Sequence, residues 1–183
     1  QENAVKPIEP VFLDFKKDMN QLTAKSDIPV LYKQNTTNDL FQLIYVFDMG
    51  NNNDKALGTA FDYLEYLGTS DMTPEELKSE FYRLACTFYV SPGNERTYVV
   101  LSGLNENMPA AMQLFEKLLA DAQVNKEAYD NLVGDILKAR ADAKLNQGQN
   151  FSRLMNYAMY GPKSPATNLL TEAELASMNP QEL

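Results

Sequence analysis

One short segment of this 183-residue chain carries three side chains at the spacing of a metal site. Asp62, Glu65 and Tyr66 stand at positions i, i+3 and i+4 of a helix that is expected over 55–67, within the segment from Gly58 to Thr69. On an α-helix, side chains at i and i+4 lie one above the other, so two ligands can grip one metal ion while a carboxylate at i+3 deprotonates its bound water. A neutral phenol is a poor zinc ligand, so we expect no working zinc site here.

The chain contains no histidine and one cysteine. Histidine is the commonest zinc ligand and the usual proton shuttle near neutral pH, so its absence excludes a His-ligated zinc and a Ser-His or Cys-His dyad within this chain. Cys86 cannot form an internal disulfide and lacks the usual base, so it is expected to be a small buried apolar residue. A lone thiol excludes neither an oxidising nor a reducing compartment.

The composition and length are those of one folded domain, with room for a short appendage. With 44% hydrophobic and 22% charged residues the chain can bury a sizeable core, and its net charge is -9. Nucleic acid and anionic membrane surfaces both require clustered Lys and Arg, so neither is expected as a partner. No apolar run approaches the roughly 20 residues that span a bilayer. The polar start and the last residues, 177–183, favour an excised piece of a longer protein.

The pattern along the chain predicts an α+β fold with the order ββααββαα. Hairpins that alternate with helix pairs favour an antiparallel sheet with helices packed on one face. The expected domains are an entry segment or linker (1–27), an αβ unit (28–161) and a C-terminal tail with one possible helix (162–183). The expected elements are a hairpin of strands 28–34 and 40–47, a helix over 55–67, a second helix opened by a capping box at Thr73–Glu76, a hairpin of 87–90 and 96–102, and helices over 111–119, from Asn125, over 151–160 and from Thr171.

Residues 28–160 resemble one αβ unit of the pitrilysin/insulysin (inverzincin) zinc metallopeptidase family. The resemblance rests on the end of a strand at Phe47-Asp-Met-Gly50, on the segment 58–69, and on the segment 97–107. It implies the metallopeptidase-unit fold, also called LuxS- or processing-peptidase-like. In the family motif H-x-x-E-H, Asp62 and Tyr66 would take the histidine places and Glu65 the place of the base.

This motif is degenerate, and its register is open. An alignment on Ala60 would instead put Phe61 and Glu65 in the histidine places. The third ligand of the family would fall somewhere between Asp135 and Asp142 and is not assigned. By this resemblance the chain itself has no catalytic, cofactor or metal residues.

The resemblance implies a noncatalytic unit of a zinc metallopeptidase, because the family's enzymes are assembled from homologous units of which one carries zinc. Such a unit would form chamber wall and peptide-binding surface, with zinc expected in a catalytic unit elsewhere in the parent chain or a partner. The expected partners are other αβ units and an extended peptide, which could add to the sheet along 96–102 or 28–34. A periplasmic or otherwise exported location is favoured. Two alternatives stay open: a scaffold subunit without a proteolytic role, and an independent small-ligand-binding domain.

Three further groups of residues are candidates for surface contacts. Lys16 and Lys17 are expected to be a solvated pair. Arg140 and Lys144, four residues apart, could face a partner, but solvation is favoured. The remaining group could form an apolar docking face, although core packing is the expectation: Met155, Tyr157, Met159 and Tyr160.

Overall fold

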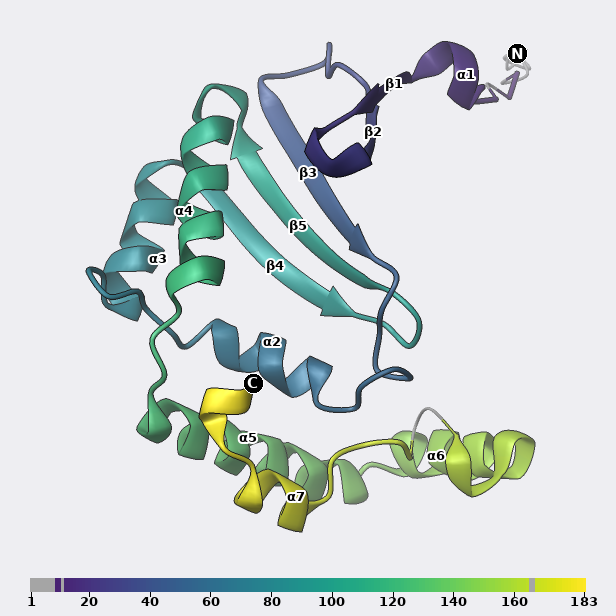
Figure 1. The fold of residues 1–183 in the computed structure, drawn as a ribbon. Coiled ribbons are helices and arrows are strands. Elements are labelled where there is room, and N and C mark those ends of the chain that lie inside the picture. Colours follow the sequence, from purple (N-terminus) through teal and green to yellow (C-terminus); the bar gives the residue numbers. More distant parts are fainter. Residues whose placement is uncertain (1–8, 11, 165–166) are drawn as a thin grey trace, which may run out of the picture. The chain divides into compact units, whose positions relative to one another are not determined.

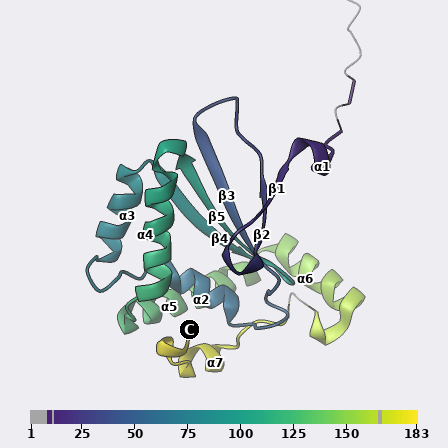
Figure 2. The same cartoon turned by 45° about the horizontal axis from the view of Figure 1, so that its top comes forward.

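The computed structural model describes residues 9–10, 12–164 and 167–183. The chain falls into two compact units that divide between Asp39 and Leu40. Within the described residues no helix is both long and apolar enough to cross a membrane. Figures 1 and 2 show the elements of both units, which are taken one at a time below.

The first unit contains a short helix and a two-stranded hairpin. Its elements are α1 (Phe15–Asp18), β1 (Asn20–Thr23), a 3-10 turn (Lys25–Asp27) and β2 (Pro29–Tyr32). β1 and β2 pair antiparallel, with Gln21 opposite Leu31. A strand is therefore present within 28–34, but the expected hairpin with 40–47 is wrong. The seven residues between β2 and β3 exceed the two to five of most hairpin loops, which left the nearer segment 20–23 as the partner.

The second unit is built on a three-stranded antiparallel sheet in the order β3-β5-β4. The strands are β3 (Leu40–Phe47), β4 (Cys86–Pro92) and β5 (Thr97–Leu104). The hairpin of β4 and β5 agrees with the expectation. β3 is almost wholly apolar, a pattern typical of a central strand, yet it is an edge strand. β5 is central, with Val99, Val100 and Leu101 all buried.

Helices α2 (Leu57–Leu64), α3 (Pro74–Arg83) and α4 (Met108–Asp121) pack on one face of this sheet. Local sequence signals predict the start of α3 and the buried face of α4. The Thr73 side chain accepts a hydrogen bond from Glu76 N and the Glu76 carboxylate accepts one from Thr73 N, which is the expected capping box. On α4 the buried positions are Ala111, Phe115 and Leu118, as their spacing predicts. The α+β class and the order ββααββαα, counted from β2, are confirmed.

The C-terminal part of the unit forms a second, smaller hydrophobic cluster. Its elements are α5 (Lys126–Lys144), α6 (Gln147–Tyr160), α7 (Glu172–Ser177) and 3-10 turns at Gly161–Lys163 and Pro180–Glu182, with another turn at Asn105–Asn107 before α4. Tyr63 and Leu67 pack with Tyr129 and Leu132 of α5 in this cluster. Leu175 of α7 is fully buried, and its carbonyl accepts a 2.8 Å hydrogen bond from the Tyr129 hydroxyl. The segment 167–183 is thus part of the fold.

Helix α7 is also held by an ion pair between Lys55 and Glu174. This contact, with further hydrogen bonds from Thr171, lowers the pKa of Glu174 to about 2. A carboxyl whose pKa is lower in the folded state stabilises the fold above its ordinary pKa, and that contribution is lost as the pH falls. We therefore expect the melting temperature to fall between about pH 4.5 and pH 2 by less in Glu174→Gln than in the parent. Thermal melting by circular dichroism across this range measures it, with Glu172→Gln on the same helix as the control; equal pH profiles for all three proteins would contradict the assignment.

Candidate functional site

The three motif residues lie at the end of α2 rather than along one helical face. Asp62 is in the last turn, Glu65 is the C-cap residue and Tyr66 follows the helix. Tyr66 N donates to the carbonyl of Tyr63, three residues back, at 2.9 Å, so the last turn is tighter than an α-helical one. The helix expected over 55–67 therefore ends at Leu64, and the i and i+4 stacking that would aim two ligands at one metal ion does not hold here.

All three of these side chains are exposed. Partial burial of the carboxyl raises the pKa of Asp62 above its ordinary value. The ammonium of Lys78 lies 5.9 Å from the centre of the Tyr66 ring, a cation-π contact. In the alternative register Phe61 is half-buried and offers no ligand atom. Among the described residues no group of three or more Cys, Asp or Glu side chains could hold a metal ion, and this includes the acidic residues between Asp135 and Asp142.

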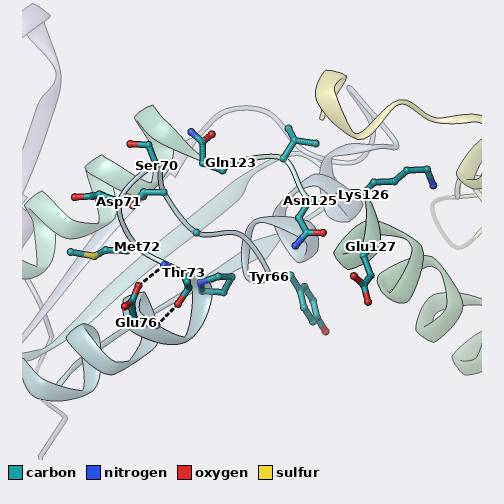
Figure 3. Close-up of a pocket in the computed structure, with 14 residues that line it drawn as sticks. Tyr66, Ser70, Asp71, Met72, Thr73, Glu76, Gln123, Asn125, Lys126 and Glu127 are labelled. Carbon is teal, nitrogen blue, oxygen red and sulfur yellow. Dashed lines mark hydrogen bonds between the residues drawn. The ribbon is translucent and has the colours of Figure 1, made fainter.

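Tyr66 also forms part of the wall of an open cavity of about 640 Å³ (Figure 3). Two loops line it, the one between α2 and α3 and the one between α4 and α5. Helices α3 and α5 therefore begin at its rim. Sequence reasoning did not identify this pocket, because its walls come from segments about 50 residues apart. The lining residues are Tyr66, Gly68 to Pro74, Glu76 and Gln123 to Glu127.

Three carboxylates in or beside this pocket have partners within the protein. Asp71 pairs with Lys117 and accepts a 2.8 Å hydrogen bond from the Thr69 hydroxyl, and both contacts lower the pKa of its carboxyl. Asp121 accepts hydrogen bonds from the hydroxyl and the backbone N–H of Ser70, which lower its pKa as well. Glu76 closes the capping box of α3. These carboxylates fix the two loops in place, and together they make the pocket a better host for a cationic or neutral group than for an anion.

The sheet offers its edges at other strands than expected. Except for Arg96, the segment 96–102 lies in β5, which is paired on both sides, so it cannot accept a peptide strand. β3 and β4 are the edges of the three-stranded sheet, and the segment 28–34 supplies β2 of the separate two-stranded sheet. Ile44 of β3 and Tyr89 of β4 both face Val100 of β5 in the register, one from each edge, and both are about half exposed.

Cys86 is buried, as expected, and opposes Gly103 of β5. Burial raises the pKa of its thiol, which donates to the carbonyl of Leu84 at 3.3 Å. A side chain at Gly103, where φ is +157°, would come within 2.5 Å of the Cys86 sulfur, so the close approach of the strands needs a glycine. Cys86 is therefore a packing residue without thiolate chemistry.

The other sequence candidates fall into different surroundings. Lys17 is exposed and pairs with Asp14 at 3.6 Å, while Lys16 is exposed as well. Lys144 is exposed, but Arg140 donates to the carbonyl of Leu170 at 2.7 Å and so ties the C-terminal segment to α5. The expected core packing on α6 is wrong, because no residue of this helix is buried. The exposed members there are Met155, Tyr157, Met159 and Tyr160.

No protein-family model and no curated protein matches the sequence, but solved structures match the fold. The periplasmic protease PqqL from Escherichia coli aligns over 100% of this chain and 22% of its own, with a TM-score of 0.73 and 14% identity. The ferredoxin protease FusC, in complex with Arabidopsis ferredoxin, aligns over 98% of this chain and 21% of its own, with a TM-score of 0.73 and 12% identity. The chain therefore has the fold of a pitrilysin-type metallopeptidase unit, as the sequence resemblance implied.

An inactive domain of an M16 peptidase from Pseudomonas fluorescens has the same fold. It aligns over 87% of this chain and 42% of its own, with a TM-score of 0.73 and 16% identity. The chain thus spans less than half the length of each of these structures. At such low identity the likeness establishes the architecture, and the role of the chain has to be argued from its own residues.

Proposed function

We propose that this chain is a noncatalytic unit of a zinc metallopeptidase, which forms chamber wall and peptide-binding surface for a catalytic unit elsewhere in the parent chain or a partner. One observation carries the proposal: a pitrilysin-type fold has Asp62, Glu65 and Tyr66 exposed at a helix end, in a chain without histidine. A catalytic zinc needs three protein ligands and an open position. Zinc would belong to the catalytic unit, and the periplasmic location of PqqL supports export of this chain too.

The peptide-binding role is best supported at the edge strand β3. An edge strand offers backbone groups with which an extended peptide can pair, and its alternate side chains give the contact specificity. On the sheet face away from the helices, Ile44 and Val46 are about half exposed, so a paired peptide would also bury apolar surface there. We propose that an extended, apolar peptide segment adds to β3 between Phe41 and Phe47.

The test is the binding of a fluorescein-labelled, unfolded and apolar peptide, followed by fluorescence anisotropy. The parent chain is expected to bind it without cleaving it. Ile44→Lys, which puts a charge where the peptide would lie, is expected to weaken binding about tenfold or more. Tyr89→Lys is the matched control, because it makes a similar change on the opposite edge at the level of the same β5 residue. It should bind like the parent.

Each part of the proposal can fail separately. Cleavage of the peptide by the chain, or a tight stoichiometric zinc isotherm in a calorimetric titration, would overturn the noncatalytic assignment. Absence of peptide binding would overturn the peptide-binding role and leave the scaffold alternative, in which the unit only assembles with others. Equal weakening by both lysine variants would place the peptide somewhere other than β3. A scaffold without peptide affinity would still have the same fold.

A further inference from the structure

Helix α6 has the apolar face of a helix that packs against a protein core, but none of its residues is buried. Its fourteen residues contribute no buried side chain, whereas α3, α4 and α5 each bury at least two. Six of its large apolar side chains are between 42% and 64% exposed: Phe151, Leu154, Met155, Tyr157, Met159 and Tyr160. Helices of this length are marginal in water without tertiary packing, so a covering surface is needed.

The apolar residues form one broad face. Phe151, Leu154, Met155, Ala158 and Met159 recur at intervals of three and four, and Tyr157 flanks them. The opposite side carries the polar residues, among them Gln149 and Arg153, the latter being the only charged residue of the helix. Covering the apolar face would therefore desolvate no charge. A membrane-surface helix would instead need several Lys or Arg residues on its polar face.

We propose that this face of α6 binds the same face of a second copy of this chain, in an antiparallel pair of helices. α6 has no Asp or Glu, unlike every other described helix of eight or more residues, so two copies of net charge -9 can approach here. In an antiparallel register Phe151 lies opposite Ala158 of the partner subunit, and Leu154 opposite Met155 of the partner subunit. Large residues then face small ones and similar residues face each other, as a two-fold interface requires.

The available area fits a weak dimer. A half-exposed aromatic or long apolar side chain offers roughly 100 Å² of surface, so Phe151, Leu154, Met155 and Met159 offer on the order of 400 Å² in each copy, while Tyr160 lies on the opposite side of the helix. A standard interface buries about 800 Å² per partner, and smaller interfaces are typical of weak, transient complexes. This inference is independent of the proposed function, since it concerns neither the β3 edge nor the motif residues of α2.

The test is sedimentation equilibrium of the chain from about 1 to about 100 µM, where a dissociation constant near 10 µM is expected. Leu154→Glu places a charge in the apolar face and should weaken the dimer at least about tenfold. Gln149→Glu makes the same change of charge on the polar side of the same helix and should leave the dimer unchanged. Both positions are exposed, so circular dichroism should show parent-like folding in both variants.

Three results would overturn the proposal. One is a parent chain that stays monomeric at the highest concentration, which would leave an adjoining unit of a longer protein as the occupant of this face. Another is a dimer that Leu154→Glu does not weaken, which would place the interface elsewhere. The last is equal weakening by both glutamate variants, which would indicate general charge repulsion instead of a contact through the apolar face.

Discussion

Replacing Phe115 with alanine is expected to lower the free energy of unfolding by about 3–5 kcal/mol. Phe115 of α4 is only 2% exposed, and its ring lies 5.0 Å from that of Phe88 and 6.3 Å from that of Tyr45. These contacts connect α4 to both edge strands of the sheet, β3 and β4. Domains of this kind are stable by about 5–15 kcal/mol, so the cavity would consume a large part of the total.

Urea unfolding followed by circular dichroism measures this loss, and two companion variants make it interpretable. Phe115→Leu keeps most of the volume and should cost clearly less, about 1–2 kcal/mol, so it remains folded if the alanine variant does not. Leu119→Ala lies one turn further along α4 with half of its side chain exposed, and should cost about 1 kcal/mol or less. A loss for Phe115→Ala no larger than for Leu119→Ala would contradict the central place of Phe115 in the core.

The parts of the fold that the sequence predicts correctly are those with local causes. The turn between β4 and β5 follows from Pro92 and Gly93, since these residues favour tight turns wherever they occur. The start of α3 follows from the capping box between Thr73 and Glu76, which requires only a spacing of three. In each case the signal and the structure that it produces lie within a few residues of each other.

The pairing of the first strands could not be predicted in this way. β3 pairs with β5, about 57 residues further along the chain, and no local pattern distinguishes that partner from the nearer β2. The apolar run of β3 favoured a central strand, because buried strands are apolar on both faces. In the structure Ile44 and Val46 are exposed instead, so the apolarity of this strand does not indicate a central position.

At the candidate site, the sequence showed which residue types occupy the motif positions, but it did not predict where α2 ends. The stripe of Leu57, Ala60 and Leu64 continues the helical spacing to Leu67, but the chain turns away after Leu64. The most buried residue of α2 is Tyr63, which lies beside that stripe and was missed. A signal did exist in the residue types. A buried tyrosine hydroxyl needs a hydrogen-bond partner, and Asn125, the N-cap residue of α5, offers backbone groups for it.

Replacing Tyr63 is expected to have the second large effect, because this residue joins the end of α2 to the start of α5. Its hydroxyl donates to the carbonyl of Asn125 and accepts from the N–H of Asn125, each at 2.9 Å. Its ring packs edge-on against Tyr129 at 5.5 Å. Tyr63→Phe leaves both backbone groups of Asn125 without this partner and should cost about 1–3 kcal/mol. Tyr63→Ala also removes the ring and should cost about 3–5 kcal/mol.

Urea unfolding of both variants, with the exposed Tyr66→Phe as the control, separates the hydroxyl from the ring. Tyr66→Phe removes a hydroxyl three residues away and should change stability by no more than about 0.5 kcal/mol. A double-mutant cycle with Tyr129→Leu should show coupling of about 0.5–1.5 kcal/mol, because the two rings are in contact. Equal stabilities of Tyr63→Phe and Tyr66→Phe would mean that the bond to Asn125 contributes nothing. The link between α2 and α5 would then rest on the packing of Tyr63 against Tyr129 alone.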